Sequence, residues 1–172
     1  MKNKEAISES IFSPKRYLLW LVIILAIFIL DYAVKRWVIY SVSIFQVINV
    51  TSYFDLVRLH NEGAAFSFLS NASGWQRWFF IIVGSVAIVW FLIWLKDAIK
   101  QGNYLLAIAL TMIIGGALGN TCDRIIYGYV VDYLSFYYQD WRYPAFNVAD
   151  TFITLGAMFF ILNEVKEFRL KS

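Results

Sequence analysis

Long apolar runs separated by short polar stretches dominate the pattern of the chain. Four of these runs are between 19 and 23 residues long, the length that an α-helix needs to cross a hydrocarbon layer about 30 Å thick. The pattern therefore predicts four transmembrane helices, at residues 17–39, 75–95, 104–122 and 146–168. The third run contains Gly115, Gly116 and Gly119, which allow a neighbouring helix or a ligand to approach closely.

The stretch from 41 to 74 has a different pattern. It is rich in Val, Ile, Phe, Thr and Tyr, and it is interrupted by turn-forming residues at Asn49, Asn61, Gly63 and Asn71. That composition favours short β-strands over a spanning helix. Because the stretch has too many apolar side chains for a free loop, we expect it to lie against the bilayer or over a site.

Composition supports the same fold class. Of the 172 residues, 60% are hydrophobic and 16% are charged, and the mean hydropathy is +0.62. A water-soluble domain of this length needs far more polar surface, since each of its helices exposes one face to water. The predicted fold class is a mainly α membrane protein, and the chain length indicates a single domain that covers residues 1–172.

The charged residues divide unequally between the two sides of the membrane. Four spans place both termini and the 96–103 turn on one side, which holds nine of the fifteen Lys and Arg residues. The positive-inside rule assigns this side to the cytoplasm. The other side holds six basic and seven acidic residues, so we expect any chemistry to face outward. The small net charge of +3 does not indicate a nucleic-acid partner.

The chain contains few of the side-chain types that commonly act as nucleophiles or metal ligands. Cys122 is the single cysteine and His60 the single histidine, so an intramolecular disulfide and a metal site built from several Cys or His ligands are excluded. We expect no cofactor. Catalysis by this chain would therefore use Asp, Glu, Lys, Ser or Tyr.

Several carboxylates have simple explanations. Asp31 and Lys35 stand four residues apart, so they share a helix face and are expected to pair at the membrane edge. Asp123 adjoins Arg124, and two interpretations remain open: an ion pair that anchors the helix end, or substrate binding. Three others are expected to be surface charges or solvated side chains: Asp55, Glu62 and Asp140.

Asp132 and Asp150 have no such explanation. Asp132 lies in YVVDYLSF with no basic residue within four positions, and Asp150 lies where the last span has already begun. A helix N-cap role is the simpler interpretation for Asp150 or for Asn147. Two aspartates placed together, however, would share one proton. The ionised one would activate water as general base, and the protonated one would act as general acid. This chemistry hydrolyses a peptide bond without Ser, Cys or metal.

Five motifs in order resemble those of the lipoprotein signal peptidases (signal peptidase II). They are the pair Asp31 and Lys35, NEGAAFSF at 61–68, GGALGNTCDR at 115–124, VVDYLSF at 130–136 and FNVAD at 146–150. The resemblance covers roughly residues 15–168. One departure is Tyr32, where the family often has Gln.

The resemblance implies an aspartic endopeptidase of the bacterial cytoplasmic (inner) membrane, with both termini cytoplasmic and the active site facing outward. Such enzymes cut diacylglyceryl-modified prolipoproteins immediately before the lipidated Cys, so the implied partners are these substrates and membrane lipids. We expect a monomer. The implied catalytic residues are Asp132 and Asp150. Positions that would bind the substrate or steady the aspartates are Asn61, Gly63, Asn120, Asp123, Arg124 and Asn147.

The resemblance also refines the expected fold. The 41–74 stretch would form a small outward β-rich cradle. A short loop or helix between the third and fourth spans would cover the cleft.

Two other functions would also place aspartates at one side of a membrane protein. A small transporter or proton-conducting protein would use the same aspartates as relay groups, but spans two and three have almost no ionisable residues at mid-depth. In a non-catalytic membrane scaffold the same aspartates would be helix caps. That role does not explain why two carboxylates without partners lie on the same side of the membrane.

Overall fold

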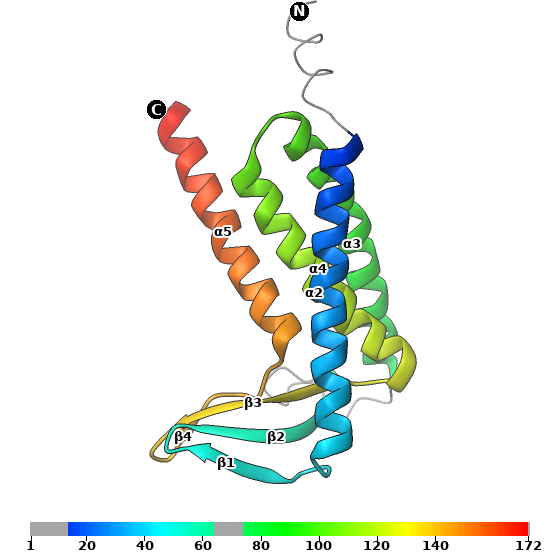
Figure 1. The fold of residues 1–172 in the computed structure, drawn as a ribbon, viewed down its shortest axis with the longest axis vertical. Helices are drawn as coiled ribbons and strands as arrows, with labels where there is room; N and C mark the ends of the chain where they lie inside the picture. The colour runs from blue at the N-terminus through cyan, green and yellow to red at the C-terminus, as the bar shows by residue number, and fades with distance from the viewer. Residues whose placement is uncertain (1–13, 64–73, 172) are drawn as a thin grey trace, which may run out of the picture.

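Four long helices form the body of the molecule in the computed structural model, which describes residues 14–63 and 74–171. They are α2 (Pro14–Ser41), α3 (Trp75–Lys100), α4 (Tyr104–Tyr127) and α5 (Val148–Lys171). All four are long and apolar enough to span a membrane, which confirms the predicted spans. They form one bundle, and the ends of α2 and α5 that are nearest the chain termini lie at the same end of it (Figure 1).

The helix α4 is the centre of this bundle. In its most apolar 18-residue window 56% of the residues are buried, against 11–17% in the other three helices. Glycines make this central position possible, because a Cβ at Gly115 would collide with Ile27 of α2, and one at Gly116 would collide with Ala149 of α5. The close helix approach that the sequence predicted at these glycines is thus confirmed.

A four-stranded antiparallel sheet crosses the other end of the bundle (Figure 1). Its order is β1-β2-β3-β4, with β1 at Val47–Thr51, β2 at Phe54–Asn61, β3 at Val130–Tyr138 and β4 at Trp141–Arg142. The strands expected in the 41–74 stretch are confirmed for residues 47–61, while Asn71 and residues 64–68 of the NEGAAFSF motif lie outside the described part of the chain.

The segment between α4 and α5 corrects one expectation. It was expected to be a short loop or helix, and it forms β3 and β4 instead. The run VVDYLSFYY is rich in β-branched and aromatic residues and is bounded by Gly128 and by a turn at Gln139 and Asp140, which is the composition of a strand. Its antiparallel partner β2 runs from Phe54 opposite Phe136 to Asn61 opposite Val130.

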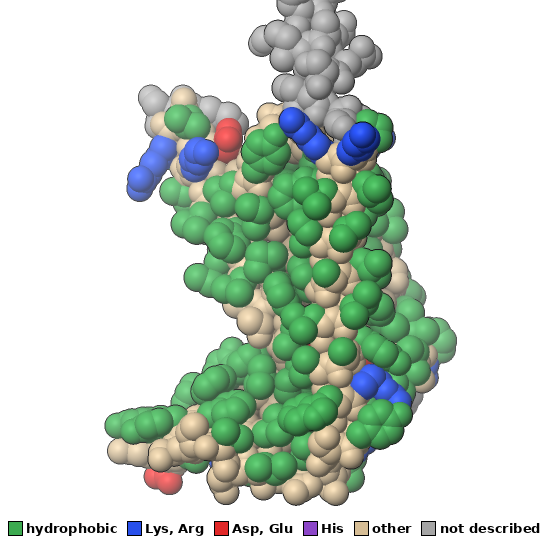
Figure 2. Space-filling model, in the orientation of Figure 1, with side chains coloured by type: hydrophobic (Ala, Val, Ile, Leu, Met, Phe, Trp, Pro, Cys, Tyr) green, Lys and Arg blue, Asp and Glu red, His purple; other side chains and the backbone are tan. Residues whose placement is uncertain are grey.

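The far part of this sheet projects beneath α5 as an arm, and the molecular surface is hollowed where the arm and α5 face each other (Figures 1 and 2). Hydrophobic side chains cover the visible helix surfaces above it (Figure 2), as expected of helices that face lipid. Lys and Arg side chains gather at the end where the termini lie (Figure 2). The fold therefore sets a charged end and a sheet end on opposite sides of an apolar body.

Candidate active site

Asp132 is the third residue of β3, at the junction of sheet and bundle, and only 4% of its surface is exposed. Strand pairing places it opposite Leu59 of β2. Its two carboxyl oxygens each accept a side-chain amide: Oδ2 from Asn61 Nδ2 at 2.9 Å and Oδ1 from Asn147 Nδ2 at 2.7 Å. The carboxyl group is therefore fixed in orientation by two elements besides its own strand.

Asp150 lies in the first turn of α5, where it takes part in a reciprocal cap. Asn147 Oδ1 accepts from the Asp150 backbone N–H at 2.9 Å, and Asp150 Oδ2 accepts from the Asn147 backbone N–H at 3.2 Å. This is a capping-box arrangement, so the N-cap interpretation of Asn147 is correct. The cap leaves Asp150 Oδ1 to accept from Asn120 Nδ2 at 2.7 Å. Asp150 can therefore cap helix α5 and contribute to the site at the same time.

Asn147 connects the two carboxyl groups. Its side chain is fully buried. It donates to Asp132 through Nδ2, while its own backbone N–H and side-chain oxygen hold Asp150. One residue therefore contacts both aspartates, which the sequence separates by 18 positions. The structure brings together the two carboxylates that the sequence singled out.

A buried ion-pair network lies beneath them, formed by Asp31, Lys35, Asn120 and Asp123. Lys35 Nζ lies 2.7 Å from Asp31 Oδ2 and 3.0 Å from Asp123 Oδ2, and it donates to Asn120 Oδ1 at 2.9 Å. The predicted Asp31–Lys35 pair is present, and both of its side chains are buried in the bundle. A lysine held on three sides orients the amide of Asn120 that reaches Asp150.

Asp123 pairs with Lys35, not with its neighbour Arg124. Arg124 instead lies over the ring of Phe80, with 5.0 Å from Cζ to the ring centroid, and it donates to the Asn120 backbone oxygen at 3.3 Å. Among the described residues its Nε has no hydrogen-bond partner. A largely buried guanidinium with a spare donor therefore lies near the carboxyl pair.

Burial has a large effect on the protonation of Asp132. Its pKa is raised from 3.8 to about 7, and removal from water is the largest cause. The nearby charge of Asp150 also raises this pKa, whereas the amides of Asn61 and Asn147 lower it. Near neutral pH a large part of Asp132 therefore carries a proton. A protonated carboxyl held beside a second carboxyl is the arrangement that general acid–base chemistry requires.

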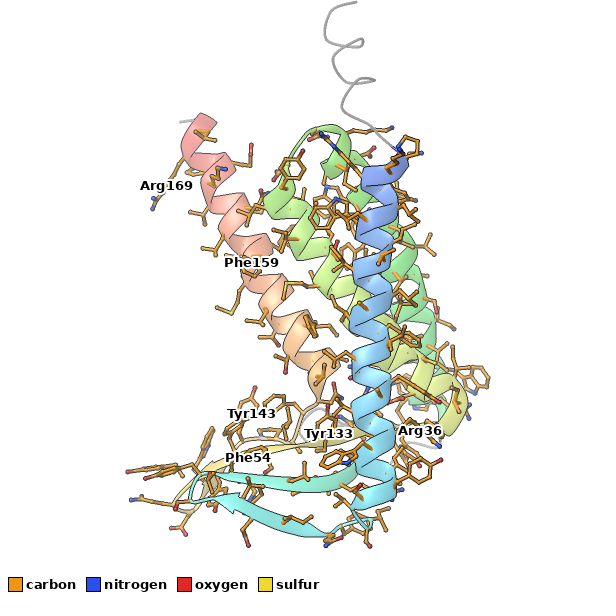
Figure 3. All side chains as sticks on the ribbon, viewed as in Figure 1. Arg36, Phe54, Tyr133, Tyr143, Phe159 and Arg169 are labelled. Atoms are coloured by element: carbon orange, nitrogen blue, oxygen red, sulfur yellow. The ribbon has the colours of Figure 1, made fainter. Side chains whose placement is uncertain are left out.

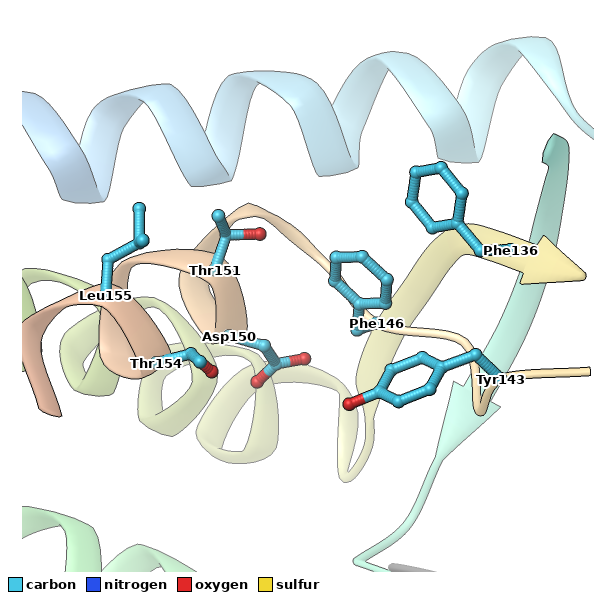
Figure 4. Close-up of a pocket in the computed structure, with 7 residues that line it drawn as sticks. All are labelled: Phe136, Tyr143, Phe146, Asp150, Thr151, Thr154 and Leu155. Atoms are coloured by element: carbon cyan, nitrogen blue, oxygen red, sulfur yellow. The ribbon is translucent and has the colours of Figure 1, made fainter. Parts of the chain in front are cut away.

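A cavity of about 360 Å³ opens beside Asp150 between α5 and the arm (Figure 4). Aromatic side chains from β3 and from the segment after β4 form one wall, and the first two turns of α5 form the other. The lining residues are Phe136, Tyr143, Phe146, Asp150, Thr151, Thr154 and Leu155. A mostly apolar pocket with one carboxylate in its wall suits an apolar ligand that carries a reactive polar group.

Of the other residues considered in the sequence, Gly63 lies at the site, and three carboxylates lie outside it. Gly63 adopts φ 115°, and its N–H donates to Asn61 Oδ1 at 2.9 Å, which orients the amide that binds Asp132. Asp140 and Glu62 are exposed, as expected. The expectation that Asp55 is a surface charge is wrong. Its side chain is fully buried, and its Oδ2 lies 2.6 Å from Arg142 Nη1.

Two residues at the site are not among the catalytic and binding residues expected from the sequence. Lys35 was assigned only to Asp31, although a lysine within a predicted span is itself a signal of a polar site. Tyr133 lies at the junction of sheet and bundle (Figure 3), where its hydroxyl accepts from the Val148 backbone N–H at 3.2 Å. Its sequence neighbours gave no sign of this contact, because Val148 is 15 positions away.

Metal binding has no obvious location in the described part of the chain. Within it, no group of three or more His, Cys, Asp or Glu side chains is arranged to hold an ion. The expectation of a reaction without cofactor stays a prediction.

Comparison with known proteins gives consistent results. The family model described as signal peptidase (SPase) II matches residues 23–166. The lipoprotein signal peptidase of Pseudoalteromonas atlantica is 45% identical over 151 residues, which cover 86% of this chain and 88% of that protein. The lipoprotein signal peptidase of Alteromonas mediterranea is 46% identical over 145 residues, which cover 84% and 79%.

Solved structures share the fold. One bacterial membrane enzyme superposes with a TM-score of 0.78 at 26% identity, covering 90% of this chain and 92% of that one. Another reaches 0.72 at 29% identity, covering 86% and 93%. The matched sequence range contains every candidate site residue, from Asp31 to Asp150.

Proposed function

The chain belongs to the signal peptidase II family, and we propose that it is an aspartic endopeptidase that cleaves diacylglyceryl-modified prolipoproteins immediately before the lipidated Cys. Family membership supports the cleavage of lipoprotein signal peptides. One observation supports the aspartic mechanism above all others: Asn147 holds the carboxyl groups of both Asp132 and Asp150. Neither aspartate has a Lys or Arg ion-pair partner among the described residues.

In this mechanism Asp150 is the general base and Asp132 the general acid. Asp150 lines the cavity, where water and substrate have access, while Asp132 is buried behind it with a raised pKa. The ionised Asp150 removes a proton from water, and the oxygen of that water attacks the scissile carbonyl carbon. Protonated Asp132 donates a hydrogen bond to the carbonyl oxygen as negative charge develops there.

Collapse of the tetrahedral intermediate completes the cycle. The proton held by Asp150 passes to the amide nitrogen, the C–N bond breaks, and a carboxyl and an amine are released. The amides of Asn61, Asn120 and Asn147 keep the carboxyl groups in place during these transfers. Because protons only move between water, the aspartates and the peptide, the reaction needs no redox partner.

The position of the cavity fits a membrane-borne substrate. A signal peptide is an apolar helix that diffuses within the bilayer, and the acyl chains on its modified Cys also belong in lipid. The cavity opens between α5 and the arm, at the sheet end of the apolar body. The scissile bond would then lie near the headgroups, where water is available.

The proposed orientation places the sheet end outside the cytoplasm and both termini inside. The described basic residues at the terminal end include Lys15, Arg16, Lys166 and Arg169, and excess positive charge marks cytoplasmic ends. A proton relay is disfavoured, because it needs ionisable groups along the membrane depth. The buried charged residues among those described are Asp31, Lys35, Asp55, Asp123 and Asp132, all in the sheet or in the helix portions nearest to it.

The test compares two precursors with the purified protein in detergent micelles. One precursor carries the diacylglyceryl group on its Cys and the other is unmodified. We expect cleavage of the modified precursor only, with the new N-terminus at the lipidated Cys, as read by mass spectrometry. Equal cleavage of both precursors, or cleavage of neither, would contradict the proposal.

A further inference from the structure

The arm ends in a hairpin that is very short. Strand β4 has only two residues, which pair as Tyr137 with Arg142 and Tyr138 with Trp141. The turn between the strands contains Gln139, which adopts φ 52°. A ladder of two residue pairs is marginal by itself, so something else must hold the hairpin against the sheet.

Tyr137 contributes to this attachment, because its backbone N–H donates to the Tyr53 oxygen and its hydroxyl to the Thr51 oxygen. On the β4 side, an ion pair with a buried carboxylate provides the attachment. Arg142 Nη1 lies 2.6 Å from Asp55 Oδ2 and donates to Ser135 Oγ at 3.2 Å. Asp55 is fully buried in β2, and its other oxygen accepts from Asn49 Nδ2 of β1 at 2.7 Å. The guanidinium also lies over the ring of Tyr137, 4.8 Å from its centroid. One contact cluster thus joins all four strands.

The residue after Arg142 reaches the active-site cavity. The Tyr143 backbone N–H donates to the Phe136 oxygen at 2.9 Å, which aligns this segment along β3. The Tyr143 ring packs edge-on against Phe146 with centroids 5.8 Å apart. Both rings line the cavity that contains Asp150, and the Tyr143 hydroxyl points toward that carboxyl group (Figure 4). Tyr143 directly follows Arg142 in the chain, so the ion pair holds the strand from which the Tyr143 segment continues along β3.

We propose that the Asp55–Arg142 ion pair positions the cavity wall formed by Tyr143 and thereby sets how tightly the apolar part of the substrate binds. In this account Arg142 is a positioning residue and Tyr143 contacts the substrate. The inference rests on the proposed function for the identity of the substrate. It follows that loss of the pair acts mainly on KM, because the hydrogen bonds that hold Asp132 and Asp150 come from Asn61, Asn120 and Asn147 and not from the hairpin.

Cleavage kinetics test the division between KM and kcat. For Arg142→Gln and for Asp55→Asn we expect KM to rise about tenfold and kcat to stay within about twofold, the pattern of lost uniform binding. Arg142→Lys retains the charge but loses the planar guanidinium, so its KM should lie between those of the wild type and Arg142→Gln. Asp140→Asn, in the exposed turn of the same hairpin, is the matched control and should leave both constants unchanged.

A double-mutant cycle tests the route through Tyr143. Tyr143→Ala should raise KM by itself, and Arg142→Gln combined with Tyr143→Ala should raise it no further, because both changes remove the same wall. Additive effects would show that Arg142 acts by another route and would overturn the proposal. A fall in kcat at unchanged KM in Arg142→Gln would overturn it as well.

A distance measurement separates this inference from the proposed function. Spin labels at Gln139→Cys on the hairpin and Leu162→Cys on α5, in a Cys122→Ala background, report the position of the arm without any substrate. We expect a narrow distance distribution in the otherwise unmodified chain and a broad one with Arg142→Gln. If the chain cleaves nothing but the distribution broadens, the proposed function fails and the positioning role stands. An unchanged distance distribution in Arg142→Gln overturns the positioning role, whatever the cleavage activity. If Arg142→Gln does not fold, the distance distribution of Arg142→Lys is compared with that of the wild type instead.

Discussion

Asp132 and Asp150 are the same residue type in different surroundings, and the proposed mechanism assigns them different tasks for that reason. Asp132 is buried in a strand and accepts two amides, whereas Asp150 lies at a helix start in the wall of a cavity. Burial penalises the charged form of Asp132. The pKa of Asp132 is therefore raised to about 7, while Asp150 lies in the wall of the open cavity.

This difference predicts how activity depends on pH. The acid must be protonated, so kcat/KM should fall as the pH rises through about 7, the raised pKa of Asp132. The Asn61 amide favours the charged carboxylate and so lowers this pKa. Asn61→Leu removes the amide, so the descending limb should move to higher pH by about one unit, since a hydrogen bond to a charged group contributes about 1.5 kcal/mol.

The pH profile of the cleavage rate checks this expectation, with Asp140→Asn as a control that should keep the wild-type limb. A limb that stays in place in Asn61→Leu, or moves to lower pH, would show that another group is the acid.

Local sequence identified these aspartates but misjudged Asp55. Asp132 and Asp150 stood out because no basic residue lies near them in the chain. The sequence around Asp55, with Arg58 three residues later, predicts a surface charge. Its partner is instead Arg142, 87 positions away. The identity of a distant partner depends on strand pairing, which a pattern of neighbours does not contain.

At the scale of elements, α2 and α4 are joined by the buried network around Lys35. Its side chain contacts Asp31 of its own helix and both Asn120 and Asp123 of α4. The amide of Asn120 in turn reaches Asp150 of α5. Three helices are therefore connected through one ammonium group, and the site depends on their relative positions.

The network predicts a large effect of Lys35→Met on stability. The change leaves two buried carboxylates without a counter-charge, which should cost about 3–5 kcal/mol. The matched control is Asp97→Asn, which breaks the exposed Asp97–Lys100 pair, 3.9 Å long, and should cost at most about 1 kcal/mol. Thermal unfolding in detergent at pH 8 measures both, and equal unfolding midpoints would refute a structural role for the network.

Element types were largely predictable, and the exception has a physical reason. The spans follow from apolar length alone. Strand β3 was missed, although VVDYLSFYY has a strand composition, because a short segment between two helices is also compatible with a loop. Pairing with β2 decides the outcome, and this is a contact between residues more than 65 positions apart.

At the scale of the whole molecule, charge and reactive groups occupy opposite ends of an apolar body. Basic side chains gather where the termini lie, and the carboxyl pair lies where the sheet crosses the bundle (Figures 1 and 2). By the positive-inside rule this division supports the proposed orientation, in which the substrate cleft faces away from the cytoplasm.

Cysteine labelling in intact cells tests this orientation. In a Cys122→Ala background, a membrane-impermeant maleimide should modify Asp140→Cys in the arm and leave Lys166→Cys near the end of α5 unmodified until the cells are opened. Both positions are exposed in the structure, so access to the reagent is the only difference. The reverse labelling would place the cleft in the cytoplasm and contradict the proposed localisation.

The most direct test of the aspartic mechanism is the cleavage rate of a diacylglyceryl-modified precursor by Asp132→Asn, Asp150→Asn and Asp140→Asn beside the wild type. Each of the first two should lose at least about 100-fold in rate, the usual contribution of a general acid or base, while their thermal unfolding confirms that they fold. Asp140→Asn should cleave at the wild-type rate. Normal cleavage by folded Asp132→Asn or Asp150→Asn, or an equal loss in Asp140→Asn, would contradict the assignment of the catalytic pair.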